Sequence, residues 1–212
     1  MKKFYYILLL ITVGCYSDDS EIITSENVAH NTSELTLLLK SISSHNAAFD
    51  DRIDNTNCFS IIFPYQIQVN SELRTINSIE DISLVSSDDD IEIVYPISSV
   101  FYNYEEHQAI NQTEFNLIKN TCNVDFNIEA NHCLDIQFPI TVKEFNDLTE
   151  SFDSYQFNND KEAYLHLDNL HDNDVYEINY PIFLRDFNSD LIRVDSSQEF
   201  IETINASFQS CD

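Results

Sequence analysis

The chain has 212 residues, with 10 Lys and Arg against 37 Asp and Glu, so its formal net charge is -27. Hydrophobic residues make up 43% of it, which is enough for a packed core and too much for a disordered acidic tail. It contains one glycine, Gly14. This excludes a Walker A loop, a G-x-G-x-x-G dinucleotide motif and a G-x-S-x-G nucleophile elbow, because each needs backbone that only glycine supplies.

The first residues have the pattern of a lipoprotein signal peptide. A short basic region at 1–3 precedes an apolar run at 4–13, which is too short to span a bilayer as a helix. The run ends in Thr-Val-Gly-Cys at 12–15, which resembles the bacterial lipobox. We therefore expect residues 1–14 to be a signal peptide and Cys15 to be lipidated. The alternative is an ordinary signal peptide, or an uncleaved anchor, with an unmodified cysteine.

Residues 15–32 are predicted to be a flexible tether. Ser17, Asp18 and Asp19 resemble the acidic tag that exports lipoproteins of Bacteroidota to the cell surface, although a plain solvated tether has the same composition. Without residues 1–14, which include two lysines, the charge becomes 8 minus 37, or -29. Nucleic acid and anionic head groups repel such a chain, so we expect no nucleic-acid partner and a membrane link through the lipid alone.

An amphipathic helix is predicted over residues 33–51. The stretch Asn-Thr-Ser-Glu at 31–34 is typical of a capping box. Apolar side chains then recur at helical spacing, at Leu35, Leu38, Leu39, Ile42 and Phe49. We expect this helix to lie on the sheet of the first half of the chain. A partner helix in a coiled coil is the alternative.

All four prolines of the chain end the same motif, Ile-x-[Phe/Tyr]-Pro. The motif occurs at 61–64, 93–96, 136–139 and 178–181. Apolar residues alternate with period two through each copy, as they do on a half-buried strand. The proline lies on the opposite face and cannot donate to a ladder, so its N–H side should be an edge or a bulge.

The same signals follow each motif. Asn and Asp residues predict hairpin tips, because they tolerate left-handed turns where the chain, after Gly14, has no glycine; these tips lie at 70–73, 103, 145–148 and 188–191. Second strands are predicted at 74–76, 108–110, 155–157 and 192–194. Capping boxes then predict helix starts, in the pairs Asn77/Glu80, Asn111/Glu114, Asn159/Glu162 and Ser196/Glu199.

The sequence therefore predicts an α+β fold: an N-terminal amphipathic helix followed by four degenerate strand–hairpin–strand–helix units. Two similar halves, 52–124 and 125–212, should each contain two units and be closed by a disulfide. The motif residues expected to be almost fully buried are Ile93, Ile136, Phe138 and Ile178.

Four cysteines remain after Cys15, and an even number in an exported protein predicts disulfides. Cys58 and Cys133 open the odd units, whereas Cys122 and Cys211 follow the helices of the even units. Equivalent positions imply equivalent bonds, so we predict the bonds Cys58–Cys122 and Cys133–Cys211. The rival bond, Cys122–Cys133, would close a short loop and break the equivalence.

No residue pattern predicts a catalytic centre, a metal or a cofactor. His166 and His171 are five residues apart, so they do not share a helix face as metal ligands would. With the acids at 168, 172 and 174 they form either a weak metal site or a solvated polar loop. The acidic run at 86–90 is either an adventitious calcium site or a linker between units one and two.

Taken together, these features resemble a family of uncharacterised lipoproteins of Bacteroidota, chiefly of flavobacteria. The matching features are the lipobox, the leucine-rich helix, the stretch His-Asn-Ala-Ala-Phe-Asp at 45–50 running into Asn57-Cys58, and the Cys-x-x-Ile-x-[Phe/Tyr]-Pro units. The resemblance covers residues 33–211 and implies location and architecture, but no catalytic residue. Members of that family usually carry glycine in the hairpin turns, where this chain has none.

Two functional classes remain. We favour a non-catalytic outer-membrane lipoprotein on the cell surface, with the periplasmic face as second choice. It would bind a protein or glycan, or form part of the coat. The alternative is a secreted hydrolase or metal-dependent enzyme. Short repeated units leave no long loops to build a deep pocket, and this favours the binding module.

Overall fold

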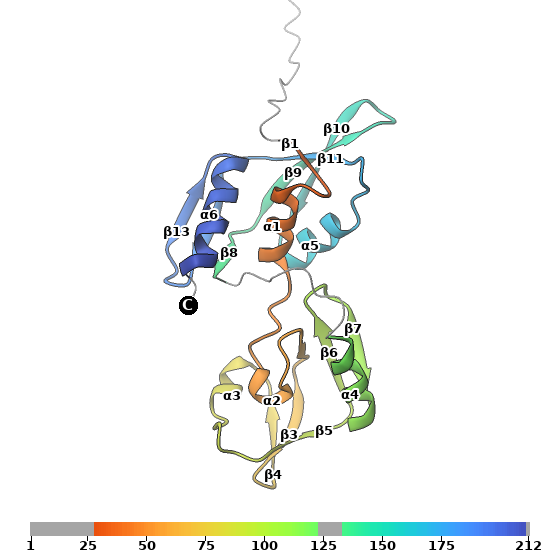
Figure 1. The fold of residues 1–212 in the computed structure, drawn as a ribbon, viewed down its shortest axis with the longest axis vertical. Coiled ribbons are helices and arrows are strands. Elements are labelled where there is room, and N and C mark those ends of the chain that lie inside the picture. Colours follow the sequence, from red (N-terminus) through yellow and green to blue (C-terminus); the bar gives the residue numbers. More distant parts are fainter. Residues whose placement is uncertain (1–27, 123–132, 211–212) are drawn as a thin grey trace, which may run out of the picture.

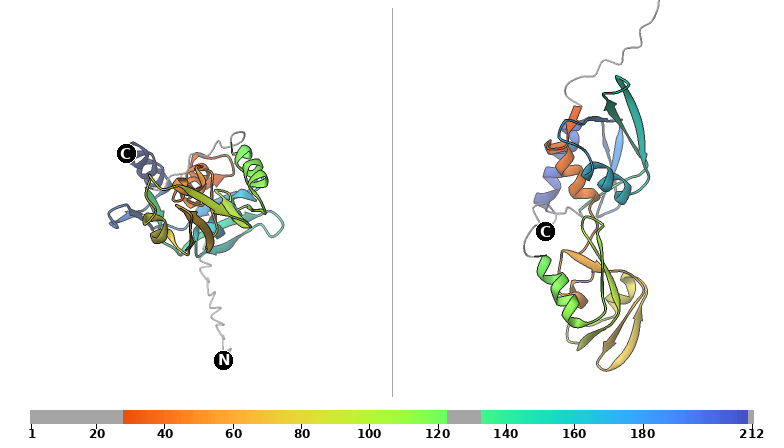
Figure 2. Two further views of the ribbon diagram at one scale, coloured as in Figure 1. Left: turned by 90° about the horizontal axis from the view of Figure 1, so that it is seen from below. Right: turned by 90° about the vertical axis from the view of Figure 1, so that its right-hand side faces the viewer.

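The structure, a computed structural model, describes residues 28–122 and 133–210. It is a mixed α and β protein whose strands form small antiparallel sheets (Figure 1). Two lobes follow one another along the longest axis (Figures 1 and 2). We call them the first lobe (residues 49–122) and the second lobe (residues 28–43 and 133–210), and each contains its own hydrophobic core.

The first lobe contains two three-stranded sheets, with strand orders β2-β6-β7 and β4-β3-β5. Its elements are α2 (Asp51–Asp54), β2 (Phe59–Ile61), β3 (Tyr65–Val69), β4 (Glu72–Ile76), α3 (Ile79–Ser83), β5 (Ile91–Val94), β6 (Ile97–Phe101), β7 (Glu106–Ala109) and α4 (Gln112–Thr121).

The second lobe contains a three-stranded sheet, β13-β12-β8, and a four-stranded sheet, β1-β11-β9-β10. Its elements are β1 (Val28–His30), α1 (Glu34–Ser43), β8 (Leu134–Ile136), β9 (Ile140–Asn146), β10 (Ser151–Phe157), α5 (Asp160–Asp168), β11 (Val175–Ile178), β12 (Ile182–Asp186), β13 (Leu191–Val194) and α6 (Ser197–Ser210).

Each proline motif is divided between two strands, so the single strand predicted through the proline is wrong. In the first motif β2 ends at Ile61, and β3 begins at Tyr65, after the cis peptide bond between Phe63 and Pro64. The other three prolines are also preceded by cis bonds. A proline has no N–H to extend a ladder, and the chain changes sheets at this point.

The two strands of each motif join different sheets. In the first lobe β2, which precedes the β3–β4 hairpin, pairs with β6 of the other hairpin. In the same way β5, which precedes the β6–β7 hairpin, pairs with β3. The second lobe repeats this exchange, because β8 pairs with β12 and β11 pairs with β9. The exchange interlocks the two hairpins within each lobe.

The four hairpins turn where the sequence predicts, but asparagine is not the usual left-handed residue. Asn70 and Ser71 have φ values of 52° and 70° at the β3–β4 tip. At the other tips the left-handed residues are Tyr104, Glu150 and Ser189, with φ values of 65°, 51° and 68°. Because the hairpin tips contain no glycine, the chain places serine, tyrosine and glutamate in a conformation that glycine adopts more easily.

Three of the predicted capping boxes are confirmed. Asn111 Oδ1 accepts a hydrogen bond from the backbone N–H of Glu114 at 3.0 Å, and Glu114 Oε2 accepts one from Ile110 N–H at 3.0 Å. Asn159 and Ser196 cap α5 and α6 in the same way. These side chains satisfy N–H groups that a helix leaves without an internal partner at its start.

The first capping box is displaced by one residue from the predicted pair, Asn77/Glu80. The N-cap of α3 is Ser78, whose side chain makes no capping hydrogen bond. Asp81 Oδ2 accepts from the backbone N–H of Asn77 at 2.8 Å, which is the position that Glu114 occupies for α4.

The N-terminal helix differs from its prediction in length and in place. It ends at Ser43 instead of residue 51, and it packs against α5 and α6 of the second lobe. Leu35, Leu39 and Ile42 belong to the core of that lobe, so the expected contact with the first half of the chain is wrong. Strand β1, which pairs with β11, lies within the predicted tether. Residues 15–27 of the predicted tether and the predicted signal peptide, 1–14, lie outside the described residues.

The predicted core residues are buried to different extents. Ile136 and Ile178 are 6% and 1% exposed, as predicted. Ile93 and Phe138 are only partly buried. Ile93 lies on the edge strand β5, and Phe138 lies in the break between β8 and β9, so neither is enclosed on all sides.

Candidate functional site

A pair of buried carboxylates lies where the chain enters the first lobe. Helix α2 is a single turn in which Asp50 is the N-cap and Asp54 is the last residue. A spacing of four residues brings two side chains to one face of a helical turn. Asp50 is 0% and Asp54 is 2% exposed. Charged residues are rarely buried so fully without a paired charge.

Within the described residues, each carboxylate makes hydrogen bonds through only one of its two oxygens. Asp50 Oδ2 accepts a hydrogen bond from Ile61 N–H at 2.8 Å, and Asp54 Oδ1 accepts one from Thr56 N–H at 3.0 Å. In the part of the chain that the structure describes, Asp50 Oδ1, Asp54 Oδ2 and the hydroxyl of Tyr65 have no partner. An unsatisfied buried polar group costs about 1–3 kcal/mol, so three of them in one region require an explanation.

Burial dominates the electrostatics of this pair. It raises the pKa of Asp50 to about 7, an effect that the hydrogen bond from Ile61 N–H partly opposes. It also raises the pKa of Asp54 to about 9, and the charge of Asp50 adds to this shift. Burial and both carboxylates raise the pKa of Tyr65. Lys119 lowers the pKa of Asp54, but by less than burial raises it.

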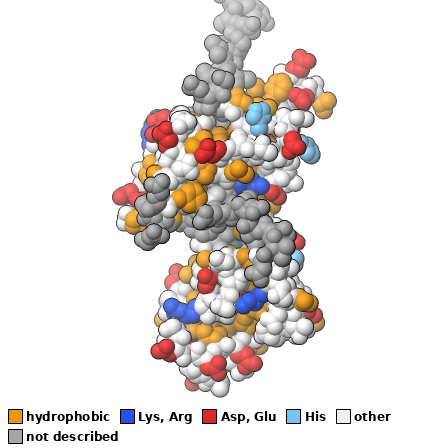
Figure 3. Space-filling model, in the orientation of Figure 1, with side chains coloured by type: hydrophobic (Ala, Val, Ile, Leu, Met, Phe, Trp, Pro, Cys, Tyr) orange, Lys and Arg blue, Asp and Glu red, His pale blue; other side chains and the backbone are white. Residues whose placement is uncertain are grey.

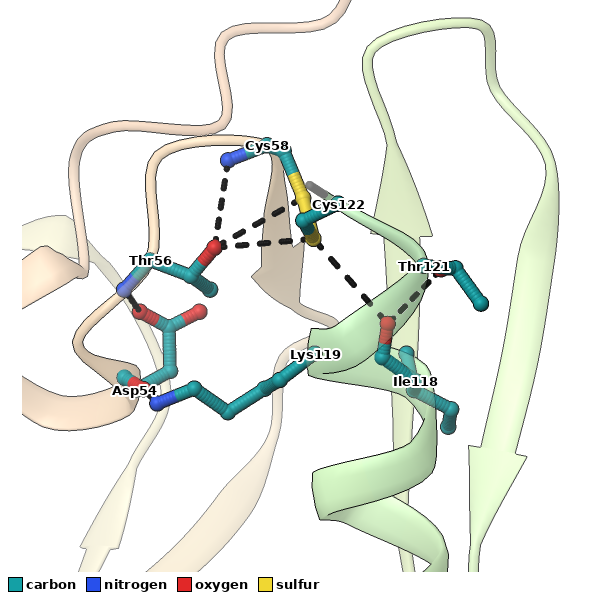
Figure 4. Close-up of a disulfide and its surroundings, with 7 residues drawn as sticks. All are labelled: Asp54, Thr56, Cys58, Ile118, Lys119, Thr121 and Cys122. Carbon is teal, nitrogen blue, oxygen red and sulfur yellow. Dashed lines mark hydrogen bonds between the residues drawn. A yellow bond between two sulfur atoms is a disulfide. The ribbon is translucent and has the colours of Figure 1, made fainter. Parts of the chain in front are cut away.

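A disulfide closes the first lobe near Asp54 (Figure 4). The Cα atoms of Cys58 and Cys122 are 5.9 Å apart, which confirms the predicted bond and excludes the rival bond between Cys122 and Cys133. The hydroxyl of Thr56 lies 3.6 Å from each sulfur. Lys119 Nζ donates to the backbone carbonyl of Asp54 at 2.6 Å, so α4 and α2 are held together next to the disulfide.

The other predicted disulfide stays a prediction. Cys133 is disulfide-bonded, but its predicted partner, Cys211, lies outside the described residues, as does the lipidation site, Cys15.

The tip of the β6–β7 hairpin lies at the junction between the lobes (Figures 1 and 2). The hydroxyl of Tyr104 donates to the backbone carbonyl of Ser43, at the end of α1, at 2.9 Å. Its ring centroid lies 5.7 Å from that of Tyr164 and 5.8 Å from that of His45. Lys161 Nζ lies 5.8 Å above the same ring. This hairpin tip is therefore a docking element within the molecule.

The other three hairpin tips present apolar side chains to solvent. Leu148, at the tip of β9–β10, is 95% exposed, and Phe187, at the tip of β12–β13, is 75% exposed. Leu73 is 61% exposed just after the turn of β3–β4. Equivalent hairpins thus divide into one tip that is covered and three that are open.

The histidines considered as metal ligands have other roles. His166 Nε2 lies 2.9 Å from Glu144 Oε2, and its ring packs against Tyr155 and Phe157. His171 lies beyond the end of α5, where its backbone N–H donates to Asp174 Oδ2 at 2.6 Å. Among the described residues, no group of three or more His, Cys, Asp or Glu side chains is placed to hold a metal ion.

The acidic run at 86–90 joins α3 to β5, and its central carboxylate is used internally. Asp89 Oδ1 accepts from Asn70 Nδ2 at 2.6 Å, and Asp89 Oδ2 accepts from Ser86 N–H at 2.7 Å. These hydrogen bonds lower the pKa of the Asp89 carboxyl. They also tie the run to the turn of β3–β4.

Sequence reasoning did not single out Asp50 and Asp54. The only signal was their spacing of four residues, with apolar Phe49 and Ile53 beside them, shortly before a buried strand. In a chain with 37 acids, that spacing does not distinguish a buried pair from an exposed one.

The second lobe contains a cavity of about 530 Å³ between α6 and the β12–β13 hairpin. Leu134, Phe187 and Ile192 line its apolar part, and Glu199 and Glu202 line it from α6.

No helix in the described ranges, 28–122 and 133–210, has the length and apolar composition to cross a membrane. No protein-family model, curated protein or solved structure matches this chain.

Proposed function

We propose that this protein is a non-catalytic, lipid-anchored module that binds a protein or glycan at the cell surface. The observation that carries the proposal is the unequal use of the hairpin tips. The β6–β7 tip docks through Tyr104 into the junction of the lobes, whereas Leu73, Leu148 and Phe187 stand exposed on the other tips. We infer that the exposed tips contact a partner as the covered tip contacts the second lobe. Exposed apolar side chains on rigid elements are suited to such contacts.

The anchor is the predicted lipid on Cys15. The lipobox-like sequence and the acidic residues behind it favour an outer-membrane lipoprotein of the Bacteroidota type, with the periplasmic face as second choice. Acidic side chains lie on both lobes in the view of Figure 3, and Lys and Arg are few there. Such a surface does not favour anionic head groups, so a lipid would have to supply the membrane link.

The four proline motifs support a finer architecture, in which four copies of one unit are arranged as two disulfide-closed halves. Each motif is followed by a hairpin and a helix, so that each unit has the order β-β-β-α. The bond Cys58–Cys122 spans the first two units, and we propose that Cys133–Cys211 spans the last two. Non-reducing peptide mapping tests this: a Cys133–Cys211 peptide is expected, and a free Cys211 thiol would contradict it.

The anchor is tested by Cys15→Ser. We expect the wild-type chain to partition into the detergent phase and the variant into the aqueous phase, because several acyl chains hold a protein firmly to a bilayer. Protease added to intact cells should remove the wild-type protein. A Cys15→Ser variant that still partitions with detergent would contradict lipidation, and protection from protease until lysis would place the protein in the periplasm.

Binding is tested with the soluble fragment 25–212 on a glycan array and on intact cells. The variant Leu148→Asn with Phe187→Asn should bind at least about tenfold more weakly, because apolar anchors dominate such interfaces. Leu84→Asn is the matched control, since Leu84 is 73% exposed but lies at the end of α3 and not on a hairpin tip. Equal losses in the control and the tip variant would contradict a role of the tips.

A further inference from the structure

Three buried oxygen atoms of the first lobe have no hydrogen-bond partner among the described residues. Asp50 Oδ1 and Asp54 Oδ2 come from the two ends of the α2 turn, and the third oxygen is the hydroxyl of Tyr65 at the start of β3. These residues are 0%, 2% and 4% exposed. The ring of Tyr65 stacks on Phe63, and Phe63 stacks on Phe49, with ring centroids 5.6 Å apart in both pairs. Because Phe49 directly precedes Asp50, the three groups lie in one buried region.

The chemistry of these atoms selects the kind of ligand. All three are oxygens, and hard cations prefer oxygen ligands. Two carboxylates carry a charge of about -2 when ionised, which a single divalent cation neutralises. Calcium accepts irregular sets of oxygens, whereas magnesium requires near-octahedral geometry and retains several waters. Because magnesium usually keeps several waters, a buried set of side-chain oxygens fits calcium better, and backbone carbonyls or waters of the same region would complete its roughly six to eight oxygen ligands.

We propose that Asp50, Asp54 and Tyr65 bind one calcium ion inside the first lobe, next to the Cys58–Cys122 disulfide. The raised pKa values of both carboxyls agree with this assignment, since a negative charge buried without a counterion is destabilised in its ionised form. The ion supplies the counter-charge and occupies the oxygens that the hydrogen bonds of Ile61 and Thr56 leave unused.

The acidic run at 86–90 provides the contrast. That run has the higher density of acids, but Asp89 already accepts hydrogen bonds through both of its oxygens. It also lies on the surface, where water solvates its charge. The calcium site is therefore expected at the sparser but buried pair, and the two regions are distinguished by matched variants.

The experiment is calcium titration of the full chain, purified oxidised in detergent, by isothermal titration calorimetry and thermal melting. We expect one strong site per chain, a higher melting temperature with calcium, and a weaker response to magnesium. Asp50→Asn and Asp54→Asn should each weaken binding at least about tenfold, because a charged ligand is lost. Tyr65→Phe removes only the hydroxyl and should weaken binding by a smaller factor. Asp89→Asn, the matched surface control, should bind as the wild type does.

Folding of the variants is checked without metal. Asn has nearly the size of Asp and removes a buried charge, so both Asn variants should melt at or above the wild-type temperature in a chelator. Three outcomes would overturn the assignment: no calcium binding by the wild type, binding that is unchanged in both Asn variants, or tighter binding of magnesium than of calcium. The first outcome indicates that the carboxyls share a proton or a water instead. The tip-binding experiment does not depend on this result.

Discussion

The two lobes share the order β-β-β-α-β-β-β-α and the same strand exchange, but they differ in the elements that cover them. The second lobe is covered by α1 and β1, which come from the N-terminal side of the chain. The first lobe has no such cover in the described residues and is closed by the Cys58–Cys122 bond. A small core buries little apolar surface, so a covalent closure contributes a larger share of its stability.

Their buried tyrosines show the same contrast. In the second lobe the hydroxyl of Tyr176 lies 2.9 Å from Thr36 Oγ1 of α1, and this hydrogen bond satisfies both groups. In the first lobe the hydroxyl of Tyr65 has no partner among the described residues. The covering helix thus completes the polar interior of one lobe, while the other retains unsatisfied atoms.

Removal of the disulfide should have the largest effect and should be confined to the first lobe. In the chain-entropy model, closing a loop of 64 residues stabilises the fold by about 4 kcal/mol. We expect Cys58→Ser with Cys122→Ser to lose a large part of this free energy of unfolding. Limited proteolysis with mass spectrometry should then find first cuts within 49–122. Earlier cuts in the second lobe would contradict the separate closure of the lobes.

Truncation in α1 should affect the other lobe. Leu39 is 0% exposed in the core of the second lobe, so Leu39→Ala should cost about 3 kcal/mol of unfolding free energy. Leu37 lies on the same helix but is 50% exposed, and Leu37→Ala should change stability by less than about 0.5 kcal/mol. Urea denaturation measures both values, and hydrogen exchange should assign the loss from Leu39→Ala to the second lobe. Faster hydrogen exchange in the first lobe of this variant would contradict the packing of α1 in the second lobe.

The local features of the fold were predictable, because short-range patterns determine them. The hairpin tips and the caps at Asn111, Asn159 and Ser196 follow from residue types within a few positions of each other. The capping error at Asn77 was a shift of one residue between two polar candidates, Asn77 and Ser78. Such errors are common where neighbouring residues both suit the cap.

The long-range features were not predictable from the same patterns. Period-two alternation indicates a strand, but it does not state which sheet the strand joins, so the exchange of β2 and β5 was missed. The leucine stripe of α1 fits any apolar surface, and the helix lies beside α5 and α6 instead of the first half. Asp50 and Asp54 were hidden for a similar reason, because burial distinguishes them from the other acids and a sequence does not display burial.

The helix caps of the two lobes can also be compared, and the expected changes in stability are smaller. Asn159 in the second lobe and Asn111 in the first each accept a capping hydrogen bond, so Asn159→Ala and Asn111→Ala should each cost about 1 kcal/mol. Ser78 makes no capping hydrogen bond, and Ser78→Ala should cost only a few tenths of a kcal/mol. Thermal melts of the three variants measure the order. A loss at Ser78 as large as that at Asn159 would show that the four caps are equivalent in solution.

The smallest expected effect concerns an acid of the second lobe near the junction. Burial raises the pKa of Asp160 from 3.8 to about 6, and the nearby charge of Asp135 adds to the shift. Tyr104 and Lys161 also lie close to it, from the β6–β7 tip and from α5. Because the folded pKa is raised, the protonated carboxyl favours the folded state. This contribution is complete below about pH 3.8 and is lost as the pH rises through about 6.

The amide that replaces the carboxyl in Asp160→Asn stays neutral at every pH. The variant should therefore not lose this contribution to stability as the pH rises. We expect the variant to match the wild type below pH 3.8 and to be more stable above pH 6. The gain should be below about 1 kcal/mol, because water reaches part of this side chain and screens its charge. Urea denaturation across this pH range measures the difference, with Asp172→Asn as the exposed control. A gain of the same size at low pH would mean that the carboxyl charge is not its cause, and packing at the start of α5 would then be responsible.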